Sequence, residues 1–146
     1  MQDKIKHLVR AGFAGIYMVT PEEARAENDI RQVARELKYS LYAWSITGGL
    51  VNPEKNEKRD ITDPMEVIDA VADLPEKSII ILKDFHAFLD NTSQPPNPYL
   101  VRSIREELRE ARTRGKVLLI LGCQKMLPPE IEKEFTVVEA GLPDKS

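Results

Sequence analysis

Apolar runs of strand length recur along this chain and alternate with amphipathic stretches. The longest run, Ile79–Leu82, has four consecutive aliphatic residues, bounded by Pro75-Glu76-Lys77 before it and by Lys83-Asp84 after it. A continuous apolar run of this length is typical of a strand that is covered on both faces. Runs of the same kind occur at Gly15–Val19, Leu41–Ile46, Val117–Leu121 and Phe135–Val138. The pattern predicts a mainly parallel sheet with helices on both faces, with Ile79–Leu82 at its centre.

Start and stop signals bound the helices between these strands. Thr20, Pro21 and Glu23 form a capping-box pattern, which predicts that a helix begins there and buries Ala24 on its apolar stripe. Gly115 is a natural C-terminal stop for a long charged helix that Pro98 opens. Together the patterns predict helices over about 4–11, 20–38, 62–74, 98–113 and 128–133.

Turn-forming residues mark the remaining segments. The pair Gly48-Gly49 predicts a turn and a short return strand. Asn52–Asp60 is dominated by charged and polar residues, so we expect an exposed loop, and a solvated loop is favoured over a binding site. Asn91–Asn97 combines turn formers with two prolines and is also predicted to be a loop tip.

Composition narrows the class of protein. The chain has 146 residues, of which 42% are hydrophobic and 31% charged, as expected for one domain over residues 1–146. A net charge of −3 gives no reason to expect nucleic-acid binding. One cysteine, Cys123, and two histidines exclude an intramolecular disulfide and a zinc-type ligand cluster. No apolar run approaches the roughly 20 residues of a membrane span, so we expect a cytoplasmic protein.

Four motifs carry a family resemblance, namely Tyr17–Glu23, Tyr42–Leu50, Leu82–His86 and Pro128–Glu134. Together with the order of the elements and the ending Phe135–Pro143, they resemble the N-terminal region of a family of AAA ATPases from bacteria, cyanobacteria and plastid genomes. The resemblance covers nearly the whole chain. It implies a three-layer α/β fold, a degenerate copy of the P-loop ATPase core, with a five-stranded parallel sheet in the order 5-1-4-3-2. It also implies that the ATPase module, with its ATP and Mg²⁺, would begin after residue 146.

The place of a phosphate-binding loop tests whether nucleotide chemistry survives in this chain. Such a loop would be G-x-x-x-x-G-K-[ST] between the first strand and its helix. Here the residues are Thr20-Pro21-Glu22-Glu23-Ala24-Arg25, without a glycine. Pro21 lacks an N–H donor, and two glutamates occupy the helix end where phosphates would lie. The sequence therefore predicts helix capping and no nucleotide site.

The acids that hold Mg²⁺ and orient water in ATPases would follow the apolar strand. Asp84 stands at the first position, but Lys83 intrudes before it and Phe85 replaces the catalytic glutamate. We interpret Asp84 and His86 as a vestigial motif, with Asp84 a structural acceptor paired with Lys83 or a neighbouring turn and His86 a partly packed side chain. No catalytic residue, metal ligand or bound cofactor is predicted.

Other enzyme classes receive little support from the residues. Cys123 follows the fourth apolar run, but no histidine is fixed near it, so a buried small side chain is favoured over a nucleophile. Neither a G-x-S-x-G elbow nor a G-x-G-x-x-G dinucleotide motif is present.

Two functional hypotheses remain. The first is a non-catalytic domain that serves an AAA ATPase, in cis or in trans, by docking a partner or client or by shaping the oligomer, and that is a monomer or weak dimer by itself. Its candidate interaction surface comprises Arg102, Arg105, Arg109 and Arg112, for which a solvated helix face is the plainer interpretation, and the loop Asn52–Asp60. The second is an independent ligand-binding or hydrolytic domain that gathers Asp84, His86, Thr47 and Cys123 at the carboxyl ends of the strands.

Overall fold

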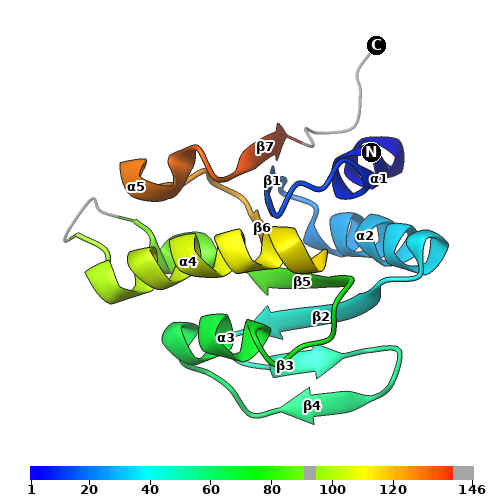
Figure 1. Cartoon of the computed structure of the whole chain (residues 1–146), viewed down its shortest axis with the longest axis horizontal. Helices are drawn as coiled ribbons and strands as arrows, with labels where there is room; N and C mark the ends of the chain where they lie inside the picture. Colours follow the sequence, from blue (N-terminus) through cyan, green and yellow to red (C-terminus); the bar gives the residue numbers. More distant parts are fainter. Residues whose placement is uncertain (91–94, 140–146) are drawn as a thin grey trace.

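A seven-stranded sheet lies between two layers of helices in the computed structural model, which describes residues 1–90 and 95–139 (Figure 1). Strand β5 (Ser78–Lys83) is central, as predicted. Helices α1 (Gln2–Arg10) and α2 (Glu23–Leu37) cover one face, and α3 (Pro64–Val71) and α4 (Pro98–Arg114) cover the other. The three-layer α/β architecture is therefore confirmed.

The strand order is β4-β3-β2-β5-β6-β1-β7. The parallel strands are β5 together with β1 (Gly15–Val19), β2 (Ser40–Ser45), β6 (Val117–Gly122) and β7 (Thr136–Glu139). They follow one another as β7-β1-β6-β5-β2, which is the predicted order 5-1-4-3-2 of the parallel strands, but the sheet has seven strands, so the predicted count of five is wrong and the full order differs. The cause is an antiparallel hairpin, β3 (Gly49–Asn52) and β4 (Glu57–Arg59), which extends the sheet beyond β2.

This hairpin replaces most of the loop that the sequence predicted. Gly49 has φ +74°, a backbone conformation that the turn after β2 requires, and the return strand expected there is β3. Asn52 is only 2% exposed, and its Oδ1 accepts hydrogen bonds from the N–H groups of Glu54 (3.0 Å) and Lys55 (3.1 Å). The prediction of a solvated loop over Asn52–Asp60 is therefore wrong for Asn52 and for β4. Strand β4 carries no strand signal in the sequence, because all three of its residues are charged. They are also exposed, which suits an edge strand.

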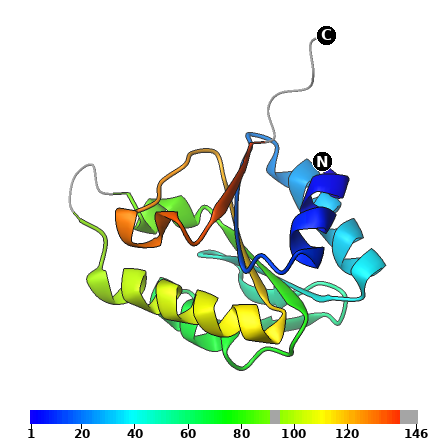
Figure 2. The same ribbon diagram turned by 45° about the horizontal axis from the view of Figure 1, so that its top comes forward.

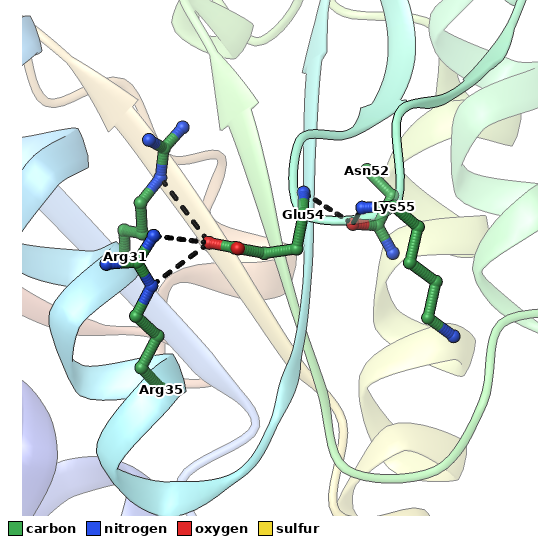
Figure 3. Close-up of polar contacts among 5 residues, drawn as sticks. All are labelled: Arg31, Arg35, Asn52, Glu54 and Lys55. Atoms are coloured by element: carbon green, nitrogen blue, oxygen red, sulfur yellow. Dashed lines mark hydrogen bonds and ion pairs between the residues drawn. The ribbon is translucent and has the colours of Figure 1, made fainter.

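The turn of the hairpin is tied to α2 by ion pairs (Figure 3). Glu54 Oε1 lies 3.1 Å from Arg35 Nη2 and 4.0 Å from Arg31 Nε, and Arg35 Nε also donates to it at 3.2 Å. These groups are partly or largely exposed, so each pair contributes little to stability. They connect the turn of the hairpin to α2.

The start of α2 differs from its prediction. The helix begins at Glu23, and Thr20 does not cap it, since its Oγ1 accepts a hydrogen bond from the N–H of Glu22 (3.1 Å) in the preceding turn. Ala24, predicted to be buried, is exposed, and Ala26 packs in the core at 4% exposure. Ala26 lies four residues before the buried Ile30 and shares its face of the helix, whereas Ala24 does not.

The other two main helices begin as predicted, and α4 also ends as predicted, whereas α3 ends at Val71, three residues before the predicted end. Asp63 Oδ1 accepts from the N–H of Met65 (2.8 Å) at the start of α3, and Asn97 Oδ1 accepts from the N–H of Tyr99 (2.9 Å) at the start of α4. Gly115, with φ +71°, ends α4. The first part of the predicted loop Asn91–Asn97 and the last residues of the motif ending at Pro143 lie outside the described residues.

Alternation along the strands builds one apolar cluster on each face of the sheet. In β5, Ile80 and Leu82 belong to the cluster beneath α3 and α4, whereas Ile79 and Ile81 belong to the cluster beneath α1 and α2. Trp44 is fully buried in the first cluster, where it packs edge-to-face on Phe85 at a centroid distance of 5.6 Å. A sheet covered on both faces leaves its carboxyl edge and the outer surfaces of the helices as places for function.

Candidate functional site

Asp84 lies at the carboxyl edge of the sheet, directly after β5. Its backbone is left-handed, with φ 55°, and its N–H donates to the carbonyl of Leu121 at 2.9 Å. The side chain is exposed, and its carboxylate makes no hydrogen bond or ion pair with the residues that the structure describes. The predicted pairing with Lys83 is wrong, whereas the backbone carbonyl of Asp84 does accept from Ala87 in the following turn.

His86 lies in the short 3-10 helix η1 (Phe85–Phe88) that follows. The residue is half-buried, and its Nδ1 is buried without a hydrogen-bond partner in the described part of the chain. The imidazole packs against the end of β6, since a Cβ added at Gly122 would lie 2.8 Å from Nδ1. His86 is therefore a partly packed side chain, as predicted.

The other two groups of the second hypothesis, Cys123 and Thr47, are both exposed. Cys123 is exposed, so the prediction of a buried thiol is wrong; the chain leaves the sheet after Gly122, and the next side chain is outside the core. Thr47 is exposed in the turn between β2 and β3. Within residues 1–90 and 95–139, no three His, Cys, Asp or Glu side chains are grouped so that they could hold a metal ion.

The N-terminus of α2, where phosphates would bind in an ATPase, is occupied by the protein's own charges. Lys83 Nζ, reaching from β5, lies 2.9 Å from Glu27 Oε1 and 4.0 Å from Glu23 Oε2. The first turns of α2 thus carry two carboxylates, which interact favourably with the positive end of the helix and would repel a phosphate. The sequence showed the glutamates but not that Lys83 reaches them.

Two buried polar side chains on other strands were not predicted. Tyr17 is fully buried; its hydroxyl donates to the carbonyl of Gln124 (2.6 Å) and accepts from the N–H of Met126 (3.0 Å). Burial raises the pKa of Tyr17, and the hydrogen bond from Met126 partly opposes this. The tyrosine fixes the connection that leads from β6 to α5 (Pro129–Glu132).

Lys116 is 1% exposed at the start of β6. Its ammonium donates to the carbonyls of Val71 (2.7 Å) and Ala72 (3.3 Å), at the C-terminal end of α3, where a positive charge is favourable. Burial lowers the pKa of Lys116 and raises that of Glu107, while the attraction between the two charges partly opposes both shifts. No sequence signal distinguished this lysine from an exposed one after Gly115.

The four arginines of the candidate interaction surface differ in what they contact. Arg102 Nε pairs with Glu106 Oε2 at 2.9 Å, and Arg112 Nη2 lies 3.7 Å from Glu134 Oε1. Arg109 lines a hollow of about 410 Å³ between α3 and α4 whose other charged residues are acidic. Arg105 lines a separate groove, together with Arg102.

That groove lies between the N-terminal half of α4 and α5, which are neighbours in both views (Figures 1 and 2). It has a volume of about 620 Å³. Its lining combines proline rings, one valine and three charged side chains: Pro95, Pro96, Pro98, Val101, Arg102, Arg105, Pro128, Pro129 and Glu130. The sequence indicates this groove only through two pairs of adjacent prolines that lie far apart along the chain, Pro95-Pro96 and Pro128-Pro129. We call it the proline groove.

Comparison with known families identifies the chain. Residues 1–140 match the family described as "SpoVK-like AAA ATPase, N-terminal domain", and the chain belongs to this family. Three similar proteins are named "Uncharacterized AAA domain-containing protein ycf46". The one from Trieres chinensis is 28% identical over 97% of this chain, that from Gracilaria tenuistipitata var. liui 26% over 98%, and that from Guillardia theta 25% over 97%.

The chain spans only a part of these relatives. The matched regions are 28%, 28% and 27% of the three proteins, respectively. In the part of the chain that the structure describes, no helix is long and apolar enough to cross a membrane.

Proposed function

We propose that this chain is a non-catalytic docking or assembly domain for an AAA ATPase module, acting in cis or in trans. The observation that carries the proposal is the ion-pair cluster at the start of α2. Glu23 and Glu27, held by Lys83, fill the position from which an ATPase core binds phosphates. Without phosphate binding, the fold retains its surfaces as the means of acting on another protein.

The ATPase partner in this proposal is the region that the curated relatives contain and this chain does not match. Their names include an AAA domain, and about a quarter of their length corresponds to the present chain. We therefore assign nucleotide hydrolysis to the partner module, and partner or client contact to this domain. Alone, it is expected to be a monomer or a weak dimer.

The alternative, an independent ligand-binding or hydrolytic domain, receives less support. It required Asp84, His86, Thr47 and Cys123 to point together into a crevice. Asp84, Thr47 and Cys123 are exposed, and among the described residues none of the four side chains bonds to another.

The test uses the Trieres chinensis relative as a host. Three proteins are compared: the full-length relative, the relative without its matched N-terminal region, and a chimaera in which residues 1–146 replace that region. Oligomer size is measured by sedimentation and ATP hydrolysis by phosphate release. We expect the truncation to change at least one of them and the chimaera to restore it.

A charge-reversal version of the chimaera addresses the candidate interaction surface. Arg105, Arg109 and Arg112 are changed to glutamate, which should alter the rate and salt dependence of association more than its final extent. The docking or assembly proposal is wrong if the truncated relative, the chimaera and the charge-reversed chimaera all match the full-length relative in oligomer size, ATP hydrolysis and client capture.

A further inference from the structure

Arg105 lies in the wall of the proline groove and has no charged partner in the described part of the chain. Its Nε is buried and has no hydrogen-bond partner, and no ion pair involves its guanidinium in the part of the chain that the structure describes. A buried N–H group without an acceptor is costly, and the cost is larger for a charged group. A ligand that supplied an acceptor at this point would recover that free energy on binding.

The neighbouring charges limit what that acceptor can be. Arg102 is engaged by Glu106 at 2.9 Å, so Arg105 is the cation of the groove that has no partner among residues 1–90 and 95–139. Glu130, which also lines the groove, would repel a second negative charge. One carboxylate, which can bind the fork of a guanidinium through two oxygens, fits this balance better than a doubly charged phosphate.

The walls define the remainder of the ligand. Five of the lining residues are prolines, whose rings present apolar surface and whose nitrogens carry no N–H donor. Val101, 7% exposed, adds an aliphatic side chain. Such walls favour apolar side chains and give no backbone donors to a strand laid beside them. The volume of about 620 Å³ lies within the range of roughly 300–1,000 Å³ in which ligand pockets fall.

We propose that the proline groove binds a short apolar peptide segment of a partner protein that carries a single carboxylate, which Arg105 receives. The inference deepens the proposed docking function, on which it rests, by naming the chemistry of the partner. Charge complementarity selects the occupant: Arg105 requires one anion, and the proline walls require apolar flanks.

The probe is an immobilised array of amidated pentapeptides, each with one glutamate among leucine, phenylalanine, tryptophan and proline. A matched array carries glutamine in place of the glutamate, and a third carries a second glutamate. The full chain is applied, and the best peptides are then measured in solution by fluorescence anisotropy. We expect binding to a subset of the one-glutamate peptides and weaker binding to both of the other arrays.

Two variants connect the binding to the groove. Arg105→Gln should weaken peptide binding about tenfold or more, because a charged hydrogen-bonding partner is lost. Arg114→Gln removes an exposed arginine from the last turn of the same helix, outside the groove, and should leave binding unchanged. Circular dichroism of both variants verifies that they are folded.

Several results would overturn the proposal. One is equal binding to the glutamate and glutamine peptides, and another is an equal loss of peptide binding in Arg105→Gln and Arg114→Gln. A third is that no peptide of the arrays binds at a concentration of about 1 mM. Self-association of the chain that Arg105→Gln abolishes would assign the groove to a second copy instead. If the arrays fail while the chimaera still restores ATPase or assembly, the groove assignment alone is wrong.

Discussion

Replacing Ile80 by alanine tests the central packing of the sheet. Ile80 is fully buried in β5, and its register partners are Tyr42 on β2 and Leu118 on β6. The change removes three carbon groups, worth about 0.8 kcal/mol each, or about 2.4 kcal/mol in transfer free energy. Because both neighbouring strands are held by their own partners, the space cannot close, and the cavity raises the cost to about 2–5 kcal/mol.

The assay is urea unfolding, followed by the fluorescence of Trp44, the single tryptophan, and by circular dichroism. Coincident transitions and an unchanged m value show that stability alone has changed. The matched control is Ile46→Ala, since Ile46 is 54% exposed and should alter stability by no more than about 0.5 kcal/mol. A cost below about 0.5 kcal/mol for Ile80→Ala would refute the central burial of β5.

Three further predictions address other parts of the molecule. In the folded protein the pKa of Lys116 is below 10.5, so between that lowered value and pH 10.5 the unfolded chain binds more protons and stability rises with pH. Lys116→Met should abolish this rise. The prediction is wrong if the difference in unfolding free energy between the wild type and Lys116→Met stays constant up to pH 10.5. The raised pKa of Tyr17 affects both proteins equally and does not change this difference. Gly49→Ala should lower the free energy of unfolding by about 1–3 kcal/mol because of the positive φ, and by more because the new methyl group would clash with the carbonyl of Arg59. Gly12 also has a positive φ but lies in open space, so Gly12→Ala measures the cost of the backbone conformation alone. Hydrogen exchange in β4 should quicken only in Gly49→Ala, and equal costs would argue against the close approach. Finally, calorimetry with Mg-ATP should give no binding heat for the wild type or for Asp84→Ala, and a micromolar dissociation constant would overturn the proposed lack of nucleotide binding.

The sequence predicted those parts of the fold whose signals are local. Ile79–Leu82 is a strand because a continuous apolar run needs cover on both faces, and α4 ends at Gly115 because glycine adopts the left-handed conformation at little cost. Strand β4 could not be predicted in this way, since its residues are charged and it exists only through pairing with β3. Its presence depends on the tertiary context.

The candidate site was predictable only at the level of which strand ends meet. The position of Asp84 and His86 follows from the end of β5, but the exposure of Cys123 depends on where the chain leaves the sheet. The proline groove requires that Pro95 and Pro128 meet in space, and the sequence contains no distance information of that kind. The chemistry of the residues could be read from the sequence, but which distant residues meet in the fold could not.

The cluster of Lys83, Glu23 and Glu27 has a consequence for the history of this fold. Restoring a phosphate loop would require glycines in place of Pro21 and its neighbours, and also the removal of both carboxylates. Each removal alone leaves Lys83 with one partner fewer and yields no phosphate site, so no single step is favoured. If the domain binds no nucleotide, as we propose, engineering a phosphate site into this fold would require replacing the β1–α2 connection and Lys83 together as one unit.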